Sequence, residues 1–526
     1  MIHGSGSPAQ PGRVVAVMAL AAVVAGCSST AAGGSHNHTA TTVRRQAVGS
    51  TPAIFVSHAG RWLTNSAGQV VIVHGVNMVF KRPPYEPQAA GFGSEAASTL
   101  AGDGLDVVRV GVIYSAVEPE PGVFSSAYVD SIVSTVAALA HEGVYSLLDF
   151  HQDQLSTGFG GEGFPAWSVD TGGLPVHRYV FPLGYTDSPA LGEAYDNFWA
   201  DRPGPGGIGL QQRYAAAWRY VAERFAGNEW VLGYDLFNEP WPGHSSDAQL
   251  GAFYTTVISA IRSVDRRHLI FYEPYVLSDF GVQTHLPDFA DPALGMSFHD
   301  YCLSDAVTHE ASCTRSEELV IANALARSAS TGNALLMSEF GSTDDLADLG
   351  RVVSDADSHQ IPWIDWAYCG CDDPTGTIPP AIEALVSNPR LPATGANVDE
   401  AKLAVLAEPY PRVVAGTPSS YSFDLVTHTF RLAYTTRSPS GRAFGAGSCT
   451  AVVIPAFQYR HGYVAEVQGA RVTSPPGAGV LTLAQSTQST QSTQSNSAVG
   501  IVTIEIRPVA NGRTTTPEEA SISACT

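Results

Sequence analysis

Short, continuous hydrophobic runs alternate with longer segments of helical periodicity along most of the chain. Eight runs rich in Val, Ile, Leu and aromatic residues lie at 70–77, 106–112, 145–151, 231–240, 269–274, 295–301, 335–341 and 363–368. Such runs are typical of parallel strands that are buried on both faces. Apolar residues recur at helical spacing in the segments between them, such as 126–142, 210–225, 248–264 and 317–330. The alternation predicts an α/β fold, a closed (β/α)₈ barrel.

Polar residues suited to chemistry stand at or near the ends of these runs. They are Arg109 in the second run, His151 in the third, Asn238 and Glu239 in the fourth, His299 and Tyr301 in the sixth, Glu339 in the seventh and Trp366 in the eighth. The carboxyl ends of barrel strands open on one face, so these side chains are expected to converge there. An open, doubly wound sheet is the rival fold, and the order of the polar residues argues against it. A single strand-end glutamate is more often structural, whereas a series in order indicates an active site.

The chain changes character after about residue 405. Strand-like runs without helical periodicity follow at 421–434, 450–457, 463–467 and 501–507. They predict an all-β sandwich. We therefore expect a barrel over 52–405 and a C-terminal sandwich over 406–526. The Gln-Ser-Thr repeats at 485–497 cannot bury a core, and we expect them to form a disordered loop.

The N-terminus has the pattern of an export signal. Arg13 precedes an apolar run over 14–24 that is too short to span a bilayer. The residues before Cys27 resemble a bacterial lipobox, in which the new N-terminal cysteine receives a lipid. We expect a signal over 1–27, lipidation of Cys27, a flexible tether over 28–51 and association with the cell surface. An ordinary signal peptide with a chance cysteine is the alternative, and it predicts secretion.

Composition narrows the classes of partner. Hydrophobic residues make up 44% of the chain and charged residues 15%, which is typical of a globular protein. The formal net charge of −21 repels nucleic acid, so no nucleic-acid partner is expected. Nothing in the sequence indicates an obligate protein partner.

Six cysteines remain besides Cys27, and an even number in an exported chain favours disulfides. Local spacing suggests that Cys302 pairs with Cys313 and Cys449 with Cys525. The remaining pair, Cys369 and Cys371, could suggest a metal site, but no second Cys/His cluster accompanies it. Zinc is therefore not expected there.

Two of the strand-end residues are glutamates, Glu239 and Glu339. Hydrolysis of a glycosidic bond needs a proton for the departing oxygen and electron density at the anomeric carbon, and two carboxyl groups can supply both. We expect Glu239 to be the protonated acid/base and Glu339 the ionised nucleophile of a retaining β-glycosidase. Such chemistry needs no metal and no cofactor. Retaining enzymes hold the two groups roughly 5–5.5 Å apart and inverting ones roughly 6.5–9.5 Å, a distance that a sequence does not give.

The order of these residues resembles glycoside hydrolase family 5 over the whole barrel. Its most specific parts are Asn238-Glu239-Pro240 and Ser338-Glu339-Phe340-Gly341. The resemblance implies the same roles for the two glutamates. It also implies that Asn238 holds the sugar 2-hydroxyl, that Tyr301 and Arg109 hydrogen-bond to Glu339, that His151 and His299 bind sugar hydroxyls or organise the carboxylates, and that Trp366 is the platform under the ring.

A narrower resemblance is to the endoglycoceramidase branch, whose members release the intact glycan from ceramide in glycosphingolipids. It is carried by His-Gly-Val-Asn-Met-Val-Phe-Lys-Arg-Pro-Pro-Tyr at 74–85 and Asp-Phe-His-Gln-Asp at 149–153. The resemblance implies that Lys81 and Asp153 bind the first sugar and that the substrate is a glycolipid or its oligosaccharide. Without these motifs, Lys81 would be read as a solvated loop residue and Asp153 as a turn residue.

Several alternatives stay open. The enzyme could be a steryl or other lipid β-glucosidase, or an endo-β-glucanase with an open groove. A carbohydrate-binding surface lipoprotein is the non-enzymatic alternative, although a binding module has no need of both glutamates. His151 and Asp153 form an H-x-D pair that a metallohydrolase could use, but no further ligand set completes a site. The aromatic-rich insertion at 154–209 is expected either to line the cleft or to form a satellite core.

Overall fold

The computed structural model describes residues 55–301, 311–375, 379–486 and 500–509. The predicted signal, Cys27 and the tether lie outside the described residues, as do Cys302, Cys525 and the side chain of Cys313. Most of the Gln-Ser-Thr stretch also lies outside them. Within the described part of the chain, no helix is both long and apolar enough to cross a membrane.

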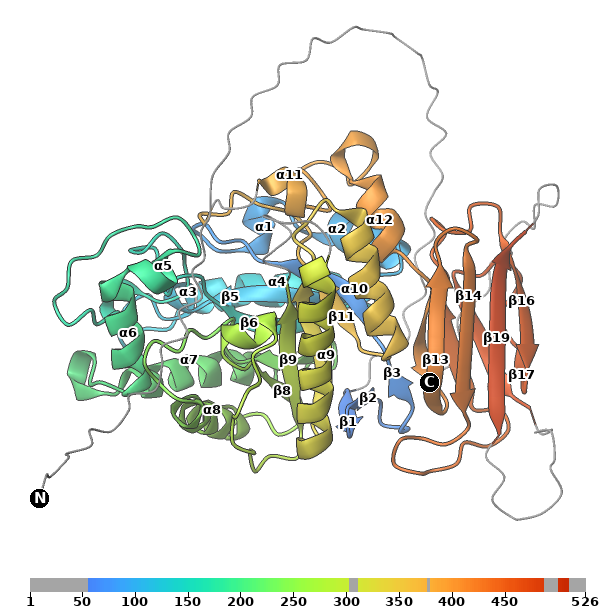
Figure 1. Ribbon diagram of the computed structural model, residues 1–526, viewed down its shortest axis with the longest axis horizontal. Helices are drawn as coiled ribbons and strands as arrows, with labels where there is room; N and C mark the ends of the chain where they lie inside the picture. Colours follow the sequence, from blue (N-terminus) through green and yellow to red (C-terminus); the bar gives the residue numbers. More distant parts are fainter. Residues whose placement is uncertain (1–54, 302–310, 376–378, 487–499, 510–526) are drawn as a thin grey trace, which may run out of the picture.

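Eight parallel strands close into a barrel, which confirms the predicted fold class (Figure 1). Around the barrel the order is β4 (His74–Met78), β5 (Val107–Ile113), β6 (Tyr145–His151), β7 (Val231–Asp235), β8 (Leu269–Tyr272), β9 (Leu294–Asp300), β10 (Ala334–Phe340) and β11 (Trp363–Asp365). Nearly every residue of these strands is buried, as their continuous hydrophobic runs predict.

Helices pack around the barrel and connect its strands. The longer ones are α2 (Ser94–Gly102), α4 (Ser126–His141), α6 (Pro189–Trp199), α7 (Leu210–Phe225), α8 (Asp247–Arg262), α9 (Ala311–Thr331), α10 (Leu346–Ser358) and α12 (Glu400–Leu406). The short ones are α1 (Pro87–Ala90), α3 (Tyr114–Val117), α5 (Gly184–Asp187), α11 (Pro380–Glu383) and the 3₁₀ turns η1 (Ala166–Ser168), η2 (Pro205–Gly207), η3 (Val276–Phe280) and η4 (Gly395–Asn397). Their starts follow local chemistry: α8 begins after a capping box formed by Ser246 and Gln249.

A short hairpin covers the amino-terminal end of the barrel. It consists of β1 (Ser57–Ala59) and β2 (Trp62–Thr64). Leu63 packs with the first residues of the barrel strands, such as Val107 and Leu232, in one hydrophobic cluster. The amide of Leu335 donates to the carbonyl of Arg61 at 3.1 Å. The carboxyl-terminal end is therefore the face at which a substrate can enter.

Two antiparallel sheets form the C-terminal sandwich and share one hydrophobic core (Figure 1). One sheet contains β13 (Thr417–Asp424), β14 (Thr429–Thr435), β19 (Ile501–Pro508) and β16 (Tyr463–Gln468). The other contains β1, β2, β3 (Val70–Val71), β12 (Tyr410–Val414), β15 (Cys449–Val453), β18 (Val480–Gln485) and β17 (Ala470–Val472). N-terminal strands thus complete a sheet of the C-terminal sandwich.

Two of the predicted strand runs are each divided. The run at 70–77 splits into β3, which pairs with β12 of the sandwich, and β4, which pairs with β5 and β11 of the barrel. The run at 421–434 is a hairpin, because the Asp424 side chain accepts hydrogen bonds from the amides of Val426 and Thr427 and turns the chain.

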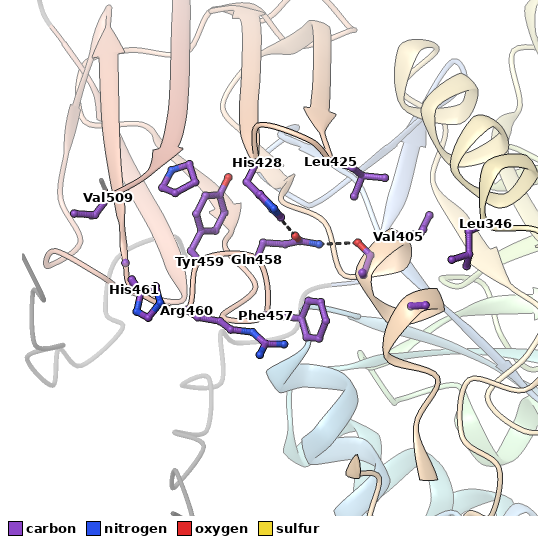
Figure 2. Close-up of a pocket in the computed structure, with 14 residues that line it drawn as sticks. Leu346, Val405, Leu425, His428, Phe457, Gln458, Tyr459, Arg460, His461 and Val509 are labelled. Carbon is purple, nitrogen blue, oxygen red and sulfur yellow. Dashed lines mark hydrogen bonds between the residues drawn. The ribbon is translucent and has the colours of Figure 1, made fainter. Parts of the chain in front are cut away.

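The barrel and the sandwich contact each other over several segments, two of which bear on the site. A cavity of about 630 Å³ lies between α10, α12 and the sandwich loops (Figure 2). There the Gln458 amide donates to the carbonyls of Ala404 and Ala407 at 2.7 and 3.0 Å. Nearby, the imidazole of His74 stacks between Trp363 of the barrel and Tyr410 of the sandwich, with ring centroids 4.0 Å apart on both sides.

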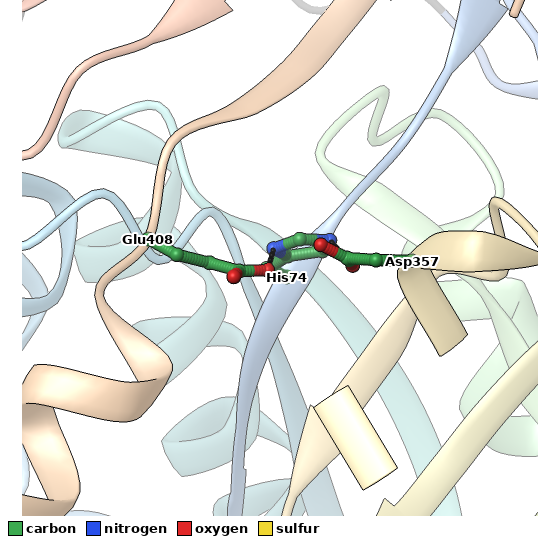
Figure 3. A group of neighbouring side chains, drawn as sticks. All are labelled: His74, Asp357 and Glu408. Carbon is green, nitrogen blue, oxygen red and sulfur yellow. Dashed lines mark ion pairs between the residues drawn. The ribbon is translucent and has the colours of Figure 1, made fainter. Parts of the chain in front are cut away.

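Two carboxyl groups flank that imidazole (Figure 3). An Asp357 oxygen lies 3.8 Å from Nε2 of His74, and a Glu408 oxygen lies 3.9 Å from Nδ1. We call His74, Asp357 and Glu408 the seam cluster. All three side chains are buried.

Candidate active site

Arg109 on β5 connects several polar side chains at the carboxyl-terminal face of the barrel. Its fully buried guanidinium bonds to side chains from five other barrel strands or the loops that follow them. The partners are Asn77, Asp149, Asp235, Asn238, Glu273 and Glu339. A buried cation needs such partners, and a planar fork of donors can fix several of them at once. Arg109 therefore sets the relative positions of these groups.

Glu339 lies at the carboxyl end of β10 and accepts hydrogen bonds on both oxygens. Arg109 Nη1 donates to Oε1, and the Tyr301 hydroxyl donates to Oε2 at 2.9 Å. A guanidinium and a hydroxyl both stabilise the ionised form of a carboxylate. Only 5% of the Glu339 side chain is exposed.

Glu239 follows β7 and adopts a left-handed backbone conformation, with φ of 43°. The backbone amide of Glu239 donates to Glu273 Oε2 at 2.8 Å. The side-chain amide of Gln152 donates to the backbone carbonyl of Glu239 at 3.2 Å. Strained backbone of this kind is common at functional sites, where the surroundings hold it in place. Burial raises the pKa of the Glu239 carboxyl, with a further contribution from the charge of Glu339, while His299 opposes the shift.

His299 on β9 lies between the two glutamates. Its Nδ1 is 2.9 Å from Glu239 Oε1 and 3.5 Å from Glu339 Oε2. Although burial lowers the pKa of His299, the charges of Glu339 and Glu273 outweigh it and raise the pKa well above its usual value. Both carboxylate oxygens therefore lie within 3.5 Å of one ring nitrogen, which places the two glutamates on either side of it.

A second group of charges surrounds Lys81. Its Nζ lies 2.6 Å from Asp153 Oδ2, 2.7 Å from Asp373 Oδ2 and 4.4 Å from the centroid of the Trp366 ring. Although burial lowers the pKa of Lys81, Asp153 and Asp373 raise it well above its usual value. Lys81 is only 6% exposed, so it is not the solvated loop lysine of the alternative interpretation.

Trp366 follows β11 and is held from two sides. Its Nε1 donates to Glu383 Oε2 at 3.0 Å, and its ring stacks on His151 with centroids 5.3 Å apart. His151 Nδ1 lies 2.7 Å from Asp149 Oδ2. Although burial lowers the pKa of His151, Asp149 and Asp153 raise it to about 10.

Asn238 completes the set of predicted residues. Its side-chain oxygen accepts from Arg109 Nη2 at 3.0 Å, and its Nδ2 donates to the carbonyl of Gln152 at 3.1 Å. The structure thus brings every predicted barrel residue to one face, in two connected groups around Arg109 and Lys81.

Residues to which the sequence analysis assigns no role also support the site. They are Asn77, Asp235, Glu273, Asp279, Asp373 and Glu383. Glu273 stands at the end of the fifth predicted strand, so its position alone could have indicated it. Asp373 and Glu383 lie in the connection after β11, Glu383 at the end of α11, and no sequence pattern marks either one as a site residue.

The insertion at 154–209 is packed and partly helical, with η1, α5, α6 and η2. Its aromatic residues join the core between α7 and α8: Phe164 and Phe198 both contact the ring of Tyr214. The Tyr195 hydroxyl donates to the side chain of Gln152, which holds the carbonyls of Asn238 and Glu239. These contacts agree with the expectation that the insertion forms a satellite core. They also support the loop that carries Glu239.

Four trios of His, Asp and Glu lie close enough to offer ligands to a metal ion within the described residues. They are His74/Asp357/Glu408, His151/Asp153/Glu162, Glu239/Asp279/His299 and Asp149/Asp235/Glu273. Lys81 and Arg109 already form ion pairs with carboxylates of the second and fourth trios. The sulfur atoms of Cys369 and Cys371 are joined in a disulfide.

Comparison with known proteins identifies the family. The family model described as Cellulase (glycosyl hydrolase family 5) matches residues 65–372, and that of the glycoside hydrolase family 5 C-terminal domain matches residues 409–501. The chain belongs to glycosyl hydrolase family 5. This family 5 chain is a glycoside hydrolase, as the two glutamates and the motifs around them predict.

Individual relatives of the family 5 chain are endoglycoceramidases. Endoglycoceramidase I of Rhodococcus hoagii is 27% identical over 461 residues, covering 82% of this chain and 86% of the relative. The solved structure of endo-glycoceramidase II from Rhodococcus sp. with a cellobiose-like imidazole matches with a TM-score of 0.70 and 27% identity, over 85% of this chain and 100% of that one. Sterylglucosidase 1 of Cryptococcus neoformans shares the fold, with a TM-score of 0.67 and 13% identity over 89% of this chain and 100% of that one.

Proposed function

We propose that this family 5 enzyme is an exported, retaining β-glycosidase that cleaves the bond between glycan and lipid in glycosphingolipids. The observation that carries the proposal is the pair of carboxyl groups around His299 Nδ1, one with a raised pKa and the other bonded to Arg109 and Tyr301. The narrower substrate assignment is supported by the endoglycoceramidase relatives, one of which has been solved in complex with ganglioside GM3.

In the first step, Glu339 attacks the anomeric carbon while Glu239 gives its proton to the departing oxygen of the lipid. The charge of Glu339 is held by Arg109 and Tyr301 until the new bond forms, so the oxygen that attacks is fixed toward the cleft. The raised pKa of Glu239 favours the protonated form, which can supply the proton that the departing oxygen needs. The products are a glycosyl-enzyme and a free lipid hydroxyl.

In the second step, Glu239 is ionised and takes a proton from water, which attacks the anomeric carbon and releases Glu339. The configuration at that carbon is retained because it is inverted twice. His299 serves both steps, since its ring nitrogen lies within reach of both carboxylates. One solved structure of endo-glycoceramidase II is that of a lactosyl-enzyme intermediate, which supports the same route here.

The remaining residues bind the sugar in this proposal. Asn238 holds the 2-hydroxyl, Trp366 lies under the ring, and Lys81, Asp153 and His151 bind further hydroxyls. Charged hydrogen-bonding groups beside an aromatic face suit a sugar, which presents hydroxyls at its edge and C–H groups on its faces.

The cell-surface location is also part of the proposal. Cys27 would carry the lipid anchor and 28–51 the tether, which would bring the enzyme close to membranes that contain its substrate. Both segments lie outside the described residues, and the sequence alone supports them.

The experiment that tests the proposal is mass spectrometry of the products from a mixed glycosphingolipid extract in mild detergent. Free ceramide together with intact oligosaccharide is the expected result. Steryl glucoside and β-glucan are incubated in parallel. Hydrolysis of either one without release of ceramide would keep the retaining mechanism and refute the glycosphingolipid assignment. Glu339→Ala is the control for activity from contaminants.

A further inference from the structure

Lys81 is held by two carboxylates, and one of them belongs to a segment that the family motifs do not include. Asp153 follows β6 within the Asp-Phe-His-Gln-Asp motif, whereas Asp373 lies in the loop that follows β11. The two Oδ2 atoms are 2.6 and 2.7 Å from Nζ of Lys81. Asp373 therefore makes as close a contact with the ammonium as Asp153 does.

The conformation of Asp373 is itself fixed. Its Oδ1 accepts hydrogen bonds from the amide of Thr375 at 2.7 Å and from its hydroxyl at 2.6 Å, so Oδ2 is left to face Lys81. The amide of Asp373 donates to the carbonyl of Gly370 at 2.9 Å. The side chain is only 10% exposed. These contacts fix the orientation of the Asp373 carboxylate toward Lys81.

Two contacts hold the segment that immediately precedes Asp373. The Cys369–Cys371 disulfide closes it just before the aspartate. Arg82 Nε donates to the carbonyl of Asp372 at 2.7 Å and ties the loop to the residue after Lys81. The turn and the Lys81 segment are thereby held against each other.

The consequence concerns the direction of the ammonium. An ammonium group has three donors, of which one goes to Asp153, while Asp373 forms an ion pair with the same group. Nζ lies 4.4 Å from the centroid of the Trp366 ring, the proposed sugar platform. Among the described residues Nζ forms no further hydrogen bond or ion pair, which leaves donor capacity for a hydroxyl of a sugar on that platform.

We propose that Asp373 is a positioning residue for sugar recognition: held by the Cys369–Cys371 turn, it fixes the ammonium of Lys81 over Trp366. The inference rests on the proposed function only in that Lys81 and Trp366 bind the sugar. It does not depend on whether the aglycone is ceramide. If Lys81 binds the sugar equally well in the ground state and in the transition state, loss of that contact changes KM and leaves kcat unchanged.

The test is the steady-state kinetics of Asp373→Asn on an aryl β-glucoside and an aryl β-lactoside. Loss of the ion pair between Asp373 and Lys81 should raise KM by about 10-fold or more, with kcat changed by less than about 2-fold. Asp372→Asn is the matched control, because its side chain is exposed and only its carbonyl makes the contact with Arg82. Asp373→Glu should recover part of the affinity.

The disulfide provides a second arm. The double substitution Cys369→Ser/Cys371→Ser should raise KM in the wild-type background, and should have no further effect when Asp373→Asn is present, because both act through one carboxylate. Equal KM values for Asp373→Asn and Asp372→Asn would overturn the proposal, as would a loss confined to kcat. If Asp373→Asn does not fold, the serine pair and Asp373→Glu decide by the same KM criterion. Aryl glycosides keep this result separate from the ceramide-release assay.

Discussion

Replacing Asp357 by Asn should make the free energy of unfolding fall less steeply as pH rises. Asp357 belongs to the seam cluster, where its carboxyl group and that of Glu408 are buried on either side of His74. No Lys or Arg forms an ion pair with either carboxyl group in the part of the chain that the structure describes. Two ionised carboxylates would therefore repel each other without compensation, and the folded protein is expected to retain protons on them.

The magnitude follows from the pKa of Asp357. Burial raises it from 3.8 to about 7, against the opposing hydrogen bonds from Glu408, Tyr421 and Trp363. Between these two values the folded state holds a proton that the unfolded state has released, so the free energy of unfolding falls as pH rises. The contribution is fully present below about pH 4 and is lost through about pH 7. From pH 5 to pH 8 the wild type should lose about 2–3 kcal/mol that Asp357→Asn does not lose.

Thermal unfolding of the full chain between pH 5 and pH 8 measures this difference. Unfolding of two packed units need not be two-state, so the melting temperatures of the two proteins are compared at each pH. The gap between them should shift by several degrees in favour of Asp357→Asn as pH rises. Asp344→Asn, an exposed aspartate near the start of α10, should follow the wild type. If Asp357→Asn also follows the wild type, the seam cluster does not hold the proton and the reasoning is wrong.

Three further predictions concern the proposed chemistry and location. Glu339→Ala should lower kcat by about 10⁴-fold or more with an unchanged melting temperature, and near wild-type turnover would exclude it as the nucleophile. Glu239→Ala should cost about 10²–10⁴-fold on substrates with poor leaving groups and much less on activated aryl glycosides, and because the pKa of Glu239 is raised, the alkaline limb of kcat/KM that it sets should disappear. Cys27→Ser should move the protein from the membrane to the soluble fraction, and an unchanged distribution would contradict the lipid anchor.

The barrel and most of its site could be predicted because parallel strands place their chemistry at a fixed point. A fully buried strand reads as a continuous apolar run, and the first polar residue at its carboxyl end must face the cleft. His299 and Glu339 follow this rule, and in the structure Glu339 accepts a hydrogen bond from Arg109 and lies 3.5 Å from Nδ1 of His299. Glu273 obeys the same rule, but no family motif drew attention to it.

Contacts made by loops and by distant segments could not be predicted in this way. Asp373 and Glu383 reach the site from the long connection after β11, and no strand-end position or motif in the sequence marks them. The pairing of β3 with β12 joins residues more than 300 positions apart, so neither strand carries a local signal of it. The predicted boundary at 405 depends on a change in hydrophobic periodicity. Periodicity does not show which strands pair, so it gives no sign that β3 belongs to a sheet of the sandwich.

The pairing of β3 with β12 changes how the sandwich relates to the catalytic face. The chain runs from β3 into β4, the barrel strand that leads to Lys81, with His74 at its start. There the imidazole is enclosed by Trp363 at the start of β11 and by Tyr410 on β12. Trp366 and Asp373 follow β11. The two strands that lead to the proposed sugar platform are therefore both anchored at their base against the sandwich. A barrel cut away at residue 405 would lose Tyr410 and expose His74 and Asp357, so we expect the isolated barrel to be destabilised first at β4 and β11, beneath the sugar-binding residues.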